Sequence, residues 1–200
     1  MTPNTEKGMD MDMKKMLSLL MAAVMLVSLF GCVAKSSHAE ELLIAARAID
    51  LDTMSAHAVL PKTSSAVPFA QEKVYAAQLQ EEEKNVLVSL YAMLQYTMGE
   101  ESSVEDGVKT VAVTLKAPDF TRIKSLVHTE ILVSGKSAEQ IVSGMIENGL
   151  IEKSYMTEKK ITVKMVEQDG EFYVSCYEKD NAELFDALVL LDMLRFFATN

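Results

Sequence analysis

The two cysteines carry the most reactive side chains of this 200-residue chain, and they stand in different surroundings. Cys32 follows an uncharged apolar run, residues 16–30, and Gly31. Cys176 lies in the segment FYVSCYEKD, which offers only Lys179 as a cation. A nucleophilic thiol needs a histidine or a cation beside it to lower its pKa, so we expect Cys176 to be a small buried core residue. Thiol modification is therefore expected at Cys32.

Residues 14–32, KKMLSLLMAAVMLVSLFGC, have the layout of a secretory signal: two lysines, a short apolar run and a small residue before the cleavage point. The run is shorter than the roughly 20 apolar residues of a transmembrane helix, which makes a retained anchor the weaker alternative. A cysteine directly after Leu-Phe-Gly resembles the lipobox of bacterial lipoproteins. The resemblance implies that Cys32 receives a diacylglycerol, takes up palmitate and becomes the first residue of the mature protein.

This interpretation divides the chain into three parts. Residues 1–31 are the leader and signal peptide, with Met13 as an alternative start to Met1, and residues 32–38 are the lipidated cysteine and a short linker. Residues 39–198 are expected to form a single domain, which is an ordinary size for one hydrophobic core. We expect this domain to lie at the cell membrane, lipid-anchored and outside the cytoplasm.

Acid–base and metal chemistry have little support in the sequence. The histidines, His38, His57 and His128, are scattered without metal-ligand spacing, so we predict no metal, no cofactor and no catalytic residue. The alternative is a cavity site in which a buried Asp119 and a tyrosine, Tyr96 or Tyr173, act on a small molecule. The residues Asp119-Phe-Thr favour a helix cap over a general base.

The charge of the chain excludes one class of partner. It has 19 Lys and Arg against 29 Asp and Glu, a net charge of -10. Binding to phosphates needs a basic patch, and none is visible, so a nucleic-acid partner is not expected. Electrostatic attraction to anionic lipid is excluded for the same reason. The expected membrane link is therefore the diacylglycerol on Cys32.

Local patterns predict the order of the helices and strands. Capping boxes begin helices at Ser37 and Ser137, and Asp119 caps a helix over residues 120–133. Apolar residues at helical spacing predict further helices over residues 71–94 and 182–197. A loop is predicted at residues 60–69, between the helix that begins at Ser37 and the helix over residues 71–94. Alternating residues predict strands at 94–98, 108–116, 159–166 and 171–177.

The second strand pair gives the most specific prediction. Asp169-Gly170 favours a two-residue type I′ turn, which pairs Met165 with Val174 and Val163 with Cys176. The apolar residues of both strands then share one face. The opposite face is polar and aromatic enough to contact a second copy or another protein. The expected interface residues on it are Thr162, Lys164, Tyr173, Ser175 and Tyr177.

The predicted order is α-α-β-β-α-α-β-β-α, an α+β fold with an antiparallel four-stranded curved sheet packed with helices. The phrases TVAVTLKAPDF and KKITVKMVEQDGEFYV, followed by NAELFDAL, resemble small lipoproteins of Gram-positive bacteria that carry an NTF2-like or cystatin-like domain of unknown function. The resemblance implies a sheet wrapped on the N-terminal helix, and no catalytic residues. We therefore expect a lipid-anchored domain that binds a ligand or a protein, with a small-molecule enzyme as the alternative.

Overall fold

The computed structural model describes residues 37–60, 66–177 and 179–199, within a compact unit that spans Ser37–Asn200. The predicted signal peptide and Cys32 lie outside the described residues. Helix α2 (His38–Ala48) begins at Ser37, whose side chain accepts a hydrogen bond from the Glu40 N–H, as the capping box predicts. It ends at Ile49, and the chain continues into α3 (Leu51–Ala56) and the two-residue strand β1 (Ala58–Val59).

The single long helix predicted for residues 71–94 is wrong, because two helices occupy this segment. They are α4 (Ala70–Ala76) and α5 (Glu81–Tyr91). Gln80 begins the second helix through a reciprocal capping box with Glu83, and the Gln80 N–H donates to the Glu83 carboxylate at 2.7 Å. The acidic run after Gln80 therefore stabilises a new helix N-terminus and does not belong to the middle of a longer helix.

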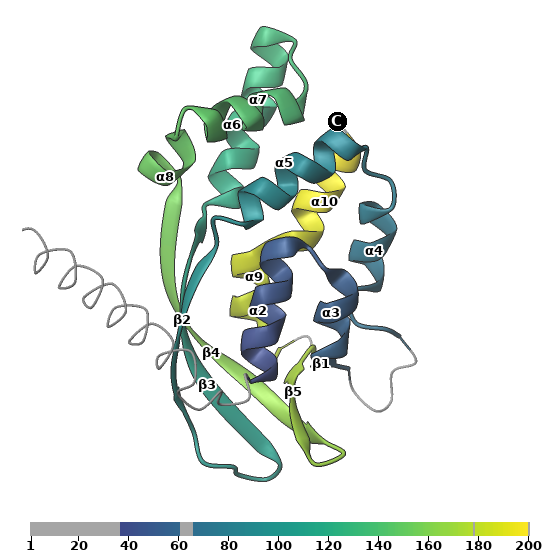
Figure 1. The fold of residues 1–200 in the computed structure, drawn as a ribbon, viewed down its shortest axis with the longest axis vertical. Coiled ribbons are helices and arrows are strands. Elements are labelled where there is room, and N and C mark those ends of the chain that lie inside the picture. Colours follow the sequence, from purple (N-terminus) through teal and green to yellow (C-terminus); the bar gives the residue numbers. More distant parts are fainter. Residues whose placement is uncertain (1–36, 61–65, 178, 200) are drawn as a thin grey trace, which may run out of the picture. The chain divides into compact units, whose positions relative to one another are not determined.

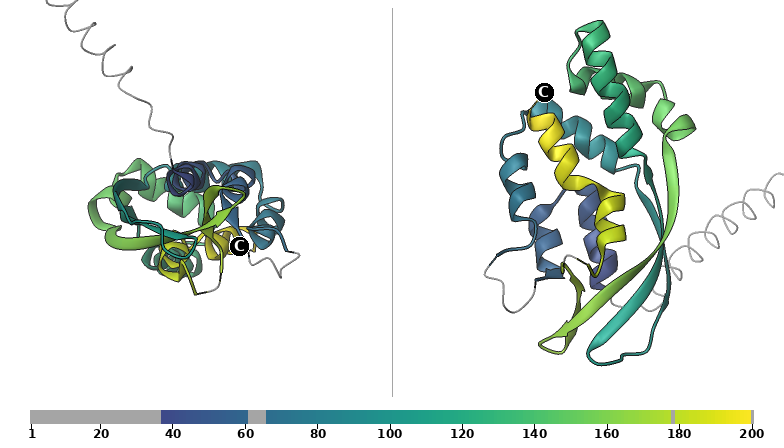
Figure 2. Two further views of the ribbon diagram at one scale, coloured as in Figure 1. Left: turned by 90° about the horizontal axis from the view of Figure 1, so that it is seen from below. Right: turned by 180° about the vertical axis from the view of Figure 1, so that it is seen from behind.

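A single curved sheet carries the fold, and helices α2, α9 and α10 lie to one side of it (Figures 1 and 2). Its strand order is β1-β5-β4-β3-β2. The four predicted strands are present as β2 (Gln95–Glu101), β3 (Val108–Pro118), β4 (Met156–Gln168) and β5 (Glu171–Ser175). These four pair antiparallel, but β1 adds a short parallel strand beside β5. The α+β class is confirmed, while the sheet is five-stranded and mixed.

Both hairpins end in Asp-Gly turns. Asp169 and Gly170 have φ angles of 53° and 84°, the left-handed values that the predicted type I′ turn requires. Asp106 and Gly107 adopt the same conformation between β2 and β3, at 51° and 72°. The two turns are neighbours, since the Glu167 N–H donates to the Gly107 carbonyl at 2.9 Å.

The register of the β4–β5 hairpin is confirmed where the two strands pair. Met165 lies opposite Val174, as predicted. The predicted pair of Val163 with Cys176 does not form, because β5 ends at Ser175. The Cys176 N–H donates instead to the Val59 carbonyl at 2.7 Å. The residue just after β5 is therefore bonded to β1 and not to β4.

Strand β2 forms one edge of the sheet, and its pairing with β3 is irregular. The register shifts between Met98 and Glu101. Gly99 lies there directly against Ala112, and a Cβ at Gly99 would come within 3.1 Å of the Ala112 Cβ. The shift is therefore located at a residue without a side chain, as is common for bulges in strands.

A helical group follows β3, and its caps are confirmed. The Asp119 carboxylate accepts from the Arg122 N–H at 3.1 Å to begin α6 (Phe120–Ser134). Ser137 forms the predicted capping box of α7 (Ala138–Glu147), and the short α8 (Leu150–Ser154) leads into β4. The helices α6 and α7 lie at the end of the unit opposite the two Asp-Gly turns (Figure 1).

The predicted last helix is divided into α9 (Ala182–Leu188) and α10 (Leu190–Ala198) by Val189. Both helices pack into the core beside α5. There the fully buried Tyr91 donates its hydroxyl to the Leu188 carbonyl at 2.7 Å. Tyr91 also stacks on Phe120, with ring centroids 4.6 Å apart. This contact joins α5, α6 and the end of α9 in one apolar cluster.

Candidate functional site

An apolar groove of about 810 Å³ lies where α3, the start of α4 and the α9–α10 joint meet. Its floor reaches the hydrophobic core, because Met54, Leu188 and Leu190 are buried. Its volume is within the range of small-ligand pockets. The apolar part of its lining comprises Met54, Leu60, Ala66, Val67, Pro68, Phe69, Ala70, Cys176, Phe185, Leu188, Val189, Leu190 and Leu191.

Two residues of this groove hold unfavourable backbone conformations. Phe69 precedes α4 with a φ of 58°, and Val189 separates α9 from α10 with a φ of 48°. The left-handed region costs an L-residue roughly 1–2 kcal/mol and is a true outlier for a β-branched side chain. Such strain is concentrated at functional sites in proteins. The Phe69 ring meets Phe185 edge-on, with centroids 6.0 Å apart, so the strained residue contributes to the wall of the groove.

Cys176 lines the same groove, and its thiol is not activated. Burial, together with the nearby Glu72 carboxylate, raises the pKa of Cys176 to about 12. The thiol is therefore protonated at neutral pH. The sequence predicts a small buried core residue here, whereas Cys176 is partly buried, packs against the core and lines the groove. A protonated thiol is a poor nucleophile.

The polar residues at the groove give it an acidic rim. Glu72, Asp186 and Asp192 line it together with Gln71 and Thr121. The Lys124 ammonium lies 3.8 Å from the Asp192 carboxylate, with both side chains about half exposed, and such a pair is weak in water. The charge at the rim therefore favours a neutral or cationic ligand over an anionic one.

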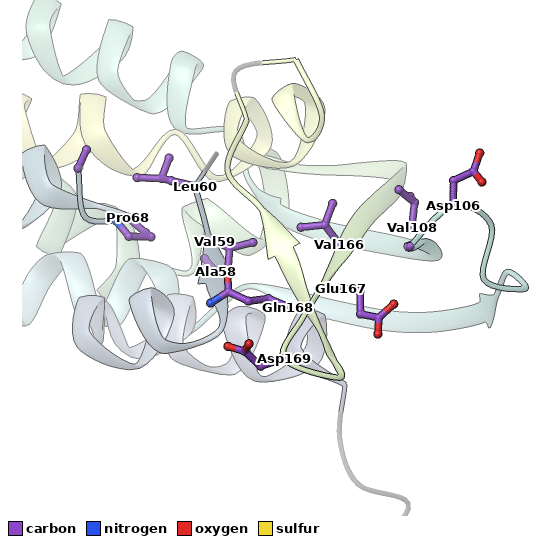
Figure 3. Close-up of a pocket in the computed structure, with 12 residues that line it drawn as sticks. Ala58, Val59, Leu60, Pro68, Asp106, Val108, Val166, Glu167, Gln168 and Asp169 are labelled. Carbon is purple, nitrogen blue, oxygen red and sulfur yellow. The ribbon is translucent and has the colours of Figure 1, made fainter. Parts of the chain in front are cut away.

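A second hollow, of about 850 Å³, lies between β1 and the two Asp-Gly turns (Figure 3). Its carboxylates come from those turns: Asp106 from the β2–β3 connection, and Glu167 and Asp169 from the β4–β5 hairpin. Among the residues that the structure describes, no three His, Cys, Asp or Glu side chains lie together in a way that could hold a metal ion. The hollow is bounded mainly by hairpin ends, whereas the apolar groove reaches the core.

The five residues predicted to form an interface are placed in different environments. Thr162 is exposed, Lys164, Tyr173 and Tyr177 are partly buried, and Ser175 is 0% exposed. Ser175 therefore has no surface to offer a partner. Its hydroxyl donates to the Asp180 carboxylate at 2.6 Å, and the Lys164 ammonium binds the other Asp180 oxygen at 2.7 Å.

Asn181 explains why Ser175 is enclosed. Its side-chain oxygen accepts from the Lys164 N–H at 2.7 Å. Its amide nitrogen donates to the Lys164 and Ser175 carbonyls, both at 2.8 Å. The Asn181 amide thus replaces the strand-to-strand bonds that would continue the β4–β5 ladder. Asn181 directly precedes α9, but its side chain makes no capping bond to that helix.

The contacts of Asp180 have a consequence for the dependence of stability on pH. Burial alone would raise the pKa of Asp180, but hydrogen bonds from Lys164 and Ser175 and the Lys164 charge lower it below its ordinary 3.8. A carboxyl whose pKa is depressed on folding stabilises the folded state above its ordinary pKa. That contribution is lost as the pH falls through the lowered value.

Two histidines that are far apart in sequence meet beside β5. The Nδ1 atoms of His38 and His57 lie 3.1 Å apart, and the rings meet edge-on. The His38 Nε2 lies 3.4 Å from the Glu171 carboxylate, and the His38 ring packs on Tyr173 with centroids 4.2 Å apart. Spacing along the sequence could not reveal this pair, because β1 brings His57 to β5 only in the folded chain. His128 is separate and exposed on α6.

The predicted acid–base pairing of Asp119 with Tyr173 does not form. Asp119 follows Pro118, which pairs with Met156 at one end of β4, whereas Tyr173 pairs with Val166 near the other end. Ten residues of strand separate these positions, about 33 Å along β4. The charged neighbours of Tyr96 are Glu40, Glu41 and Arg47. The Asp119 carboxylate caps helix α6.

Within residues 37–60, 66–177 and 179–199, none of the helices combines the length and apolar character that crossing a bilayer requires. In comparisons with known proteins, no family model, no curated protein and no solved structure matches the chain.

Proposed function

We propose that this chain is a lipid-anchored, extracytoplasmic binding domain, not an enzyme, and that it holds a small apolar ligand in the groove between α3, α4 and the α9–α10 joint. The observation that carries the proposal is an apolar groove whose floor reaches the core and whose wall includes the strained Phe69 and Val189. Strained backbone of this kind clusters at binding and catalytic sites in proteins, which supports a binding role for this wall. The acidic rim points to a ligand that is neutral or cationic.

The anchor is part of the same proposal. The apolar run before Cys32 and its resemblance to a lipobox support acylation of that cysteine. Helix α2 begins at His38, only six residues after Cys32. A chain of six residues spans at most about 20 Å, so an acylated Cys32 would hold the domain close to the bilayer.

The NTF2-like or cystatin-like assignment also belongs to the proposal. It is supported by a curved antiparallel set of four strands and by an N-terminal helix whose Leu42, Leu43 and Ala46 are buried in the core. A protein partner or a second copy at the side of β4 and β5 that carries Thr162 is the other interaction we propose. Thr162 and Tyr177 would contribute to it, and Tyr177→Ala would then change the oligomeric state in solution.

A fluorescent reporter in the groove tests ligand binding. The chain has no tryptophan, so Phe185→Trp in the full chain, held in phospholipid nanodiscs, places a single indole at the groove wall. We expect octylamine and 1-octanol to shift its emission to shorter wavelength in a saturable way. Octanoate should bind several-fold more weakly than octylamine because the Glu72 and Asp186 carboxylates repel it.

The matched control is Val133→Trp, which places the indole at a side chain that is 78% exposed on α6. Its emission should change only to the extent that the probes partition into the nanodisc lipid. An equal, unsaturable response of the two reporters would contradict the groove as a binding site. Equal binding of octylamine and octanoate would contradict only the role of the acidic rim.

A further inference from the structure

We propose that His38 and His57 form a pH-sensitive contact that fastens the start of α2 and the segment before β1 to strand β5, and that mild acid opens it. This inference does not depend on the groove or on its ligand. It rests on three segments that meet at one point: α2 through His38, the residue before β1 through His57, and β5 through Glu171 and Tyr173.

The geometry of the pair requires a particular protonation state. Two Nδ1 atoms 3.1 Å apart can share a hydrogen bond only when one carries a proton and the other presents a lone pair. The contacts are satisfied when the two Nδ1 atoms share one proton, whether the pair is neutral or carries one positive charge, and His38 donates from Nε2 to Glu171 in both cases. A pair with both rings charged would place two N–H groups and two positive charges against each other.

The burial and the charges around the pair disfavour protonation of His57. Burial lowers the pKa of His57 below its ordinary 6.5, and the adjacent His38 lowers it further, while Glu41 on α2 opposes both effects. Glu171 faces His38 from β5, and Tyr173 donates its hydroxyl to the same Glu171 oxygen at 3.4 Å. Among the residues that the structure describes, the charged groups at the pair are Glu41 and Glu171, and the ring that packs on it is Tyr173.

The backbone at His57 connects this contact to the sheet. The His57 carbonyl accepts from the Val174 N–H at 3.0 Å, and the Val59 carbonyl accepts from the Cys176 N–H at 2.7 Å. Strand β1 has only two residues, so these bonds and the histidine contact together hold the segment against β5. Loss of the histidine contact should therefore expose the Val174 and Cys176 amides to solvent more often.

The sign of the pH effect follows from linkage. The closed state resists the second proton, so the open state binds more protons as the pH falls below about 6.5, the ordinary histidine value. Closure is therefore complete above neutral pH and weakens through the window between 6.5 and the lowered pKa of His57. One linked proton changes the opening equilibrium by about tenfold for each pH unit in that window.

Hydrogen exchange on the full chain in nanodiscs tests the proposal. Protection factors of the Val174 and Cys176 amides, corrected for intrinsic exchange, would be measured at about pH 7.5 and about pH 5.5. In the wild type we expect a loss of protection of about tenfold at the lower pH. His38→Gln and His57→Gln should reduce that loss to about twofold or less, because the amide side chain does not titrate in this range. His128→Gln, at an exposed position, should behave as the wild type.

Histidine titration by NMR provides a second measurement that does not require the open state. In His38→Gln, His57 should titrate at a higher pH than in the wild type, because a repulsive neighbour has been removed. The proposal is overturned if His57 titrates identically in both proteins. It is also overturned if the Val174 and Cys176 amides lose protection equally in the wild type and both glutamine variants.

Discussion

Replacing Asn181 by alanine is expected to lower the free energy of unfolding by about 3 kcal/mol, because three hydrogen bonds made by one buried side chain are lost at once. Asn181 is 2% exposed, so little water reaches the groups that its amide now satisfies. The Lys164 N–H and the Lys164 and Ser175 carbonyls would be left unpaired between two strands. A large loss from one exchange of a polar side chain is typical of broken buried networks.

Urea unfolding of the full chain in detergent, followed by circular dichroism, would measure this loss. Asn181→Asp preserves the shape but turns an acceptor toward two carbonyls, so it should not recover the stability at neutral pH. The matched control is Asn148→Ala. The Asn148 amide also donates to a carbonyl, that of Gly144 at 2.7 Å, but it is exposed at the end of α7, and its loss should cost less than about 1 kcal/mol. Equal effects at the two positions would contradict the role of Asn181 between the strands.

Cys32→Ser is expected to abolish incorporation of labelled palmitate and to move the protein from the membrane fraction to the medium. The reason is that a hydroxyl cannot form the thioether to diacylglycerol, and the net charge of -10 provides no electrostatic attraction to anionic lipid. Without the acyl chains, the domain has no further means of binding the bilayer under this proposal. Metabolic labelling followed by fractionation of whole cells would measure both changes.

Cys176→Ala is the control for this experiment, because it removes the other cysteine of the chain. It should retain the label and the membrane fraction, since the Cys176 thiol is partly buried in the groove wall and protonated. Full palmitate incorporation in Cys32→Ser would remove the basis for both the anchor and the extracytoplasmic location.

Local signals in the sequence predicted the parts of the fold that local hydrogen bonds determine. Ser37, Asp119 and Ser137 begin helices because their side chains bond to the backbone within three residues. Asp169-Gly170 defined a turn, and the turn determined which residue of β5 lies opposite Met165. These interactions are complete within a few residues, so neighbours in sequence are enough to predict them.

The features that sequence reasoning missed depend on contacts between distant segments or on strain. Val189 divides the last helix although a β-branched residue disfavours the left-handed conformation, so no propensity could indicate the break. Asparagine is a residue type common at helix caps, and only the bonds of Asn181 to Lys164 show that it bridges two strands. His38 and His57 are brought together by the pairing of β1 with β5. Of these features, Val189 contributes to the wall of the groove.

If Cys32 is acylated as proposed, many copies share one plane, and the irregular edge strand β2 then has a consequence for them. An exposed edge with regular bonding groups invites a second sheet to pair with it, and anchored copies would meet such edges often. Here the register shift beside Gly99, followed by Glu100 and Glu101, interrupts that row of groups and adds negative charge. A crowded layer of such domains should therefore resist pairing between β2 edges, where Glu100 adds a negative charge and Glu101 is paired with Lys109.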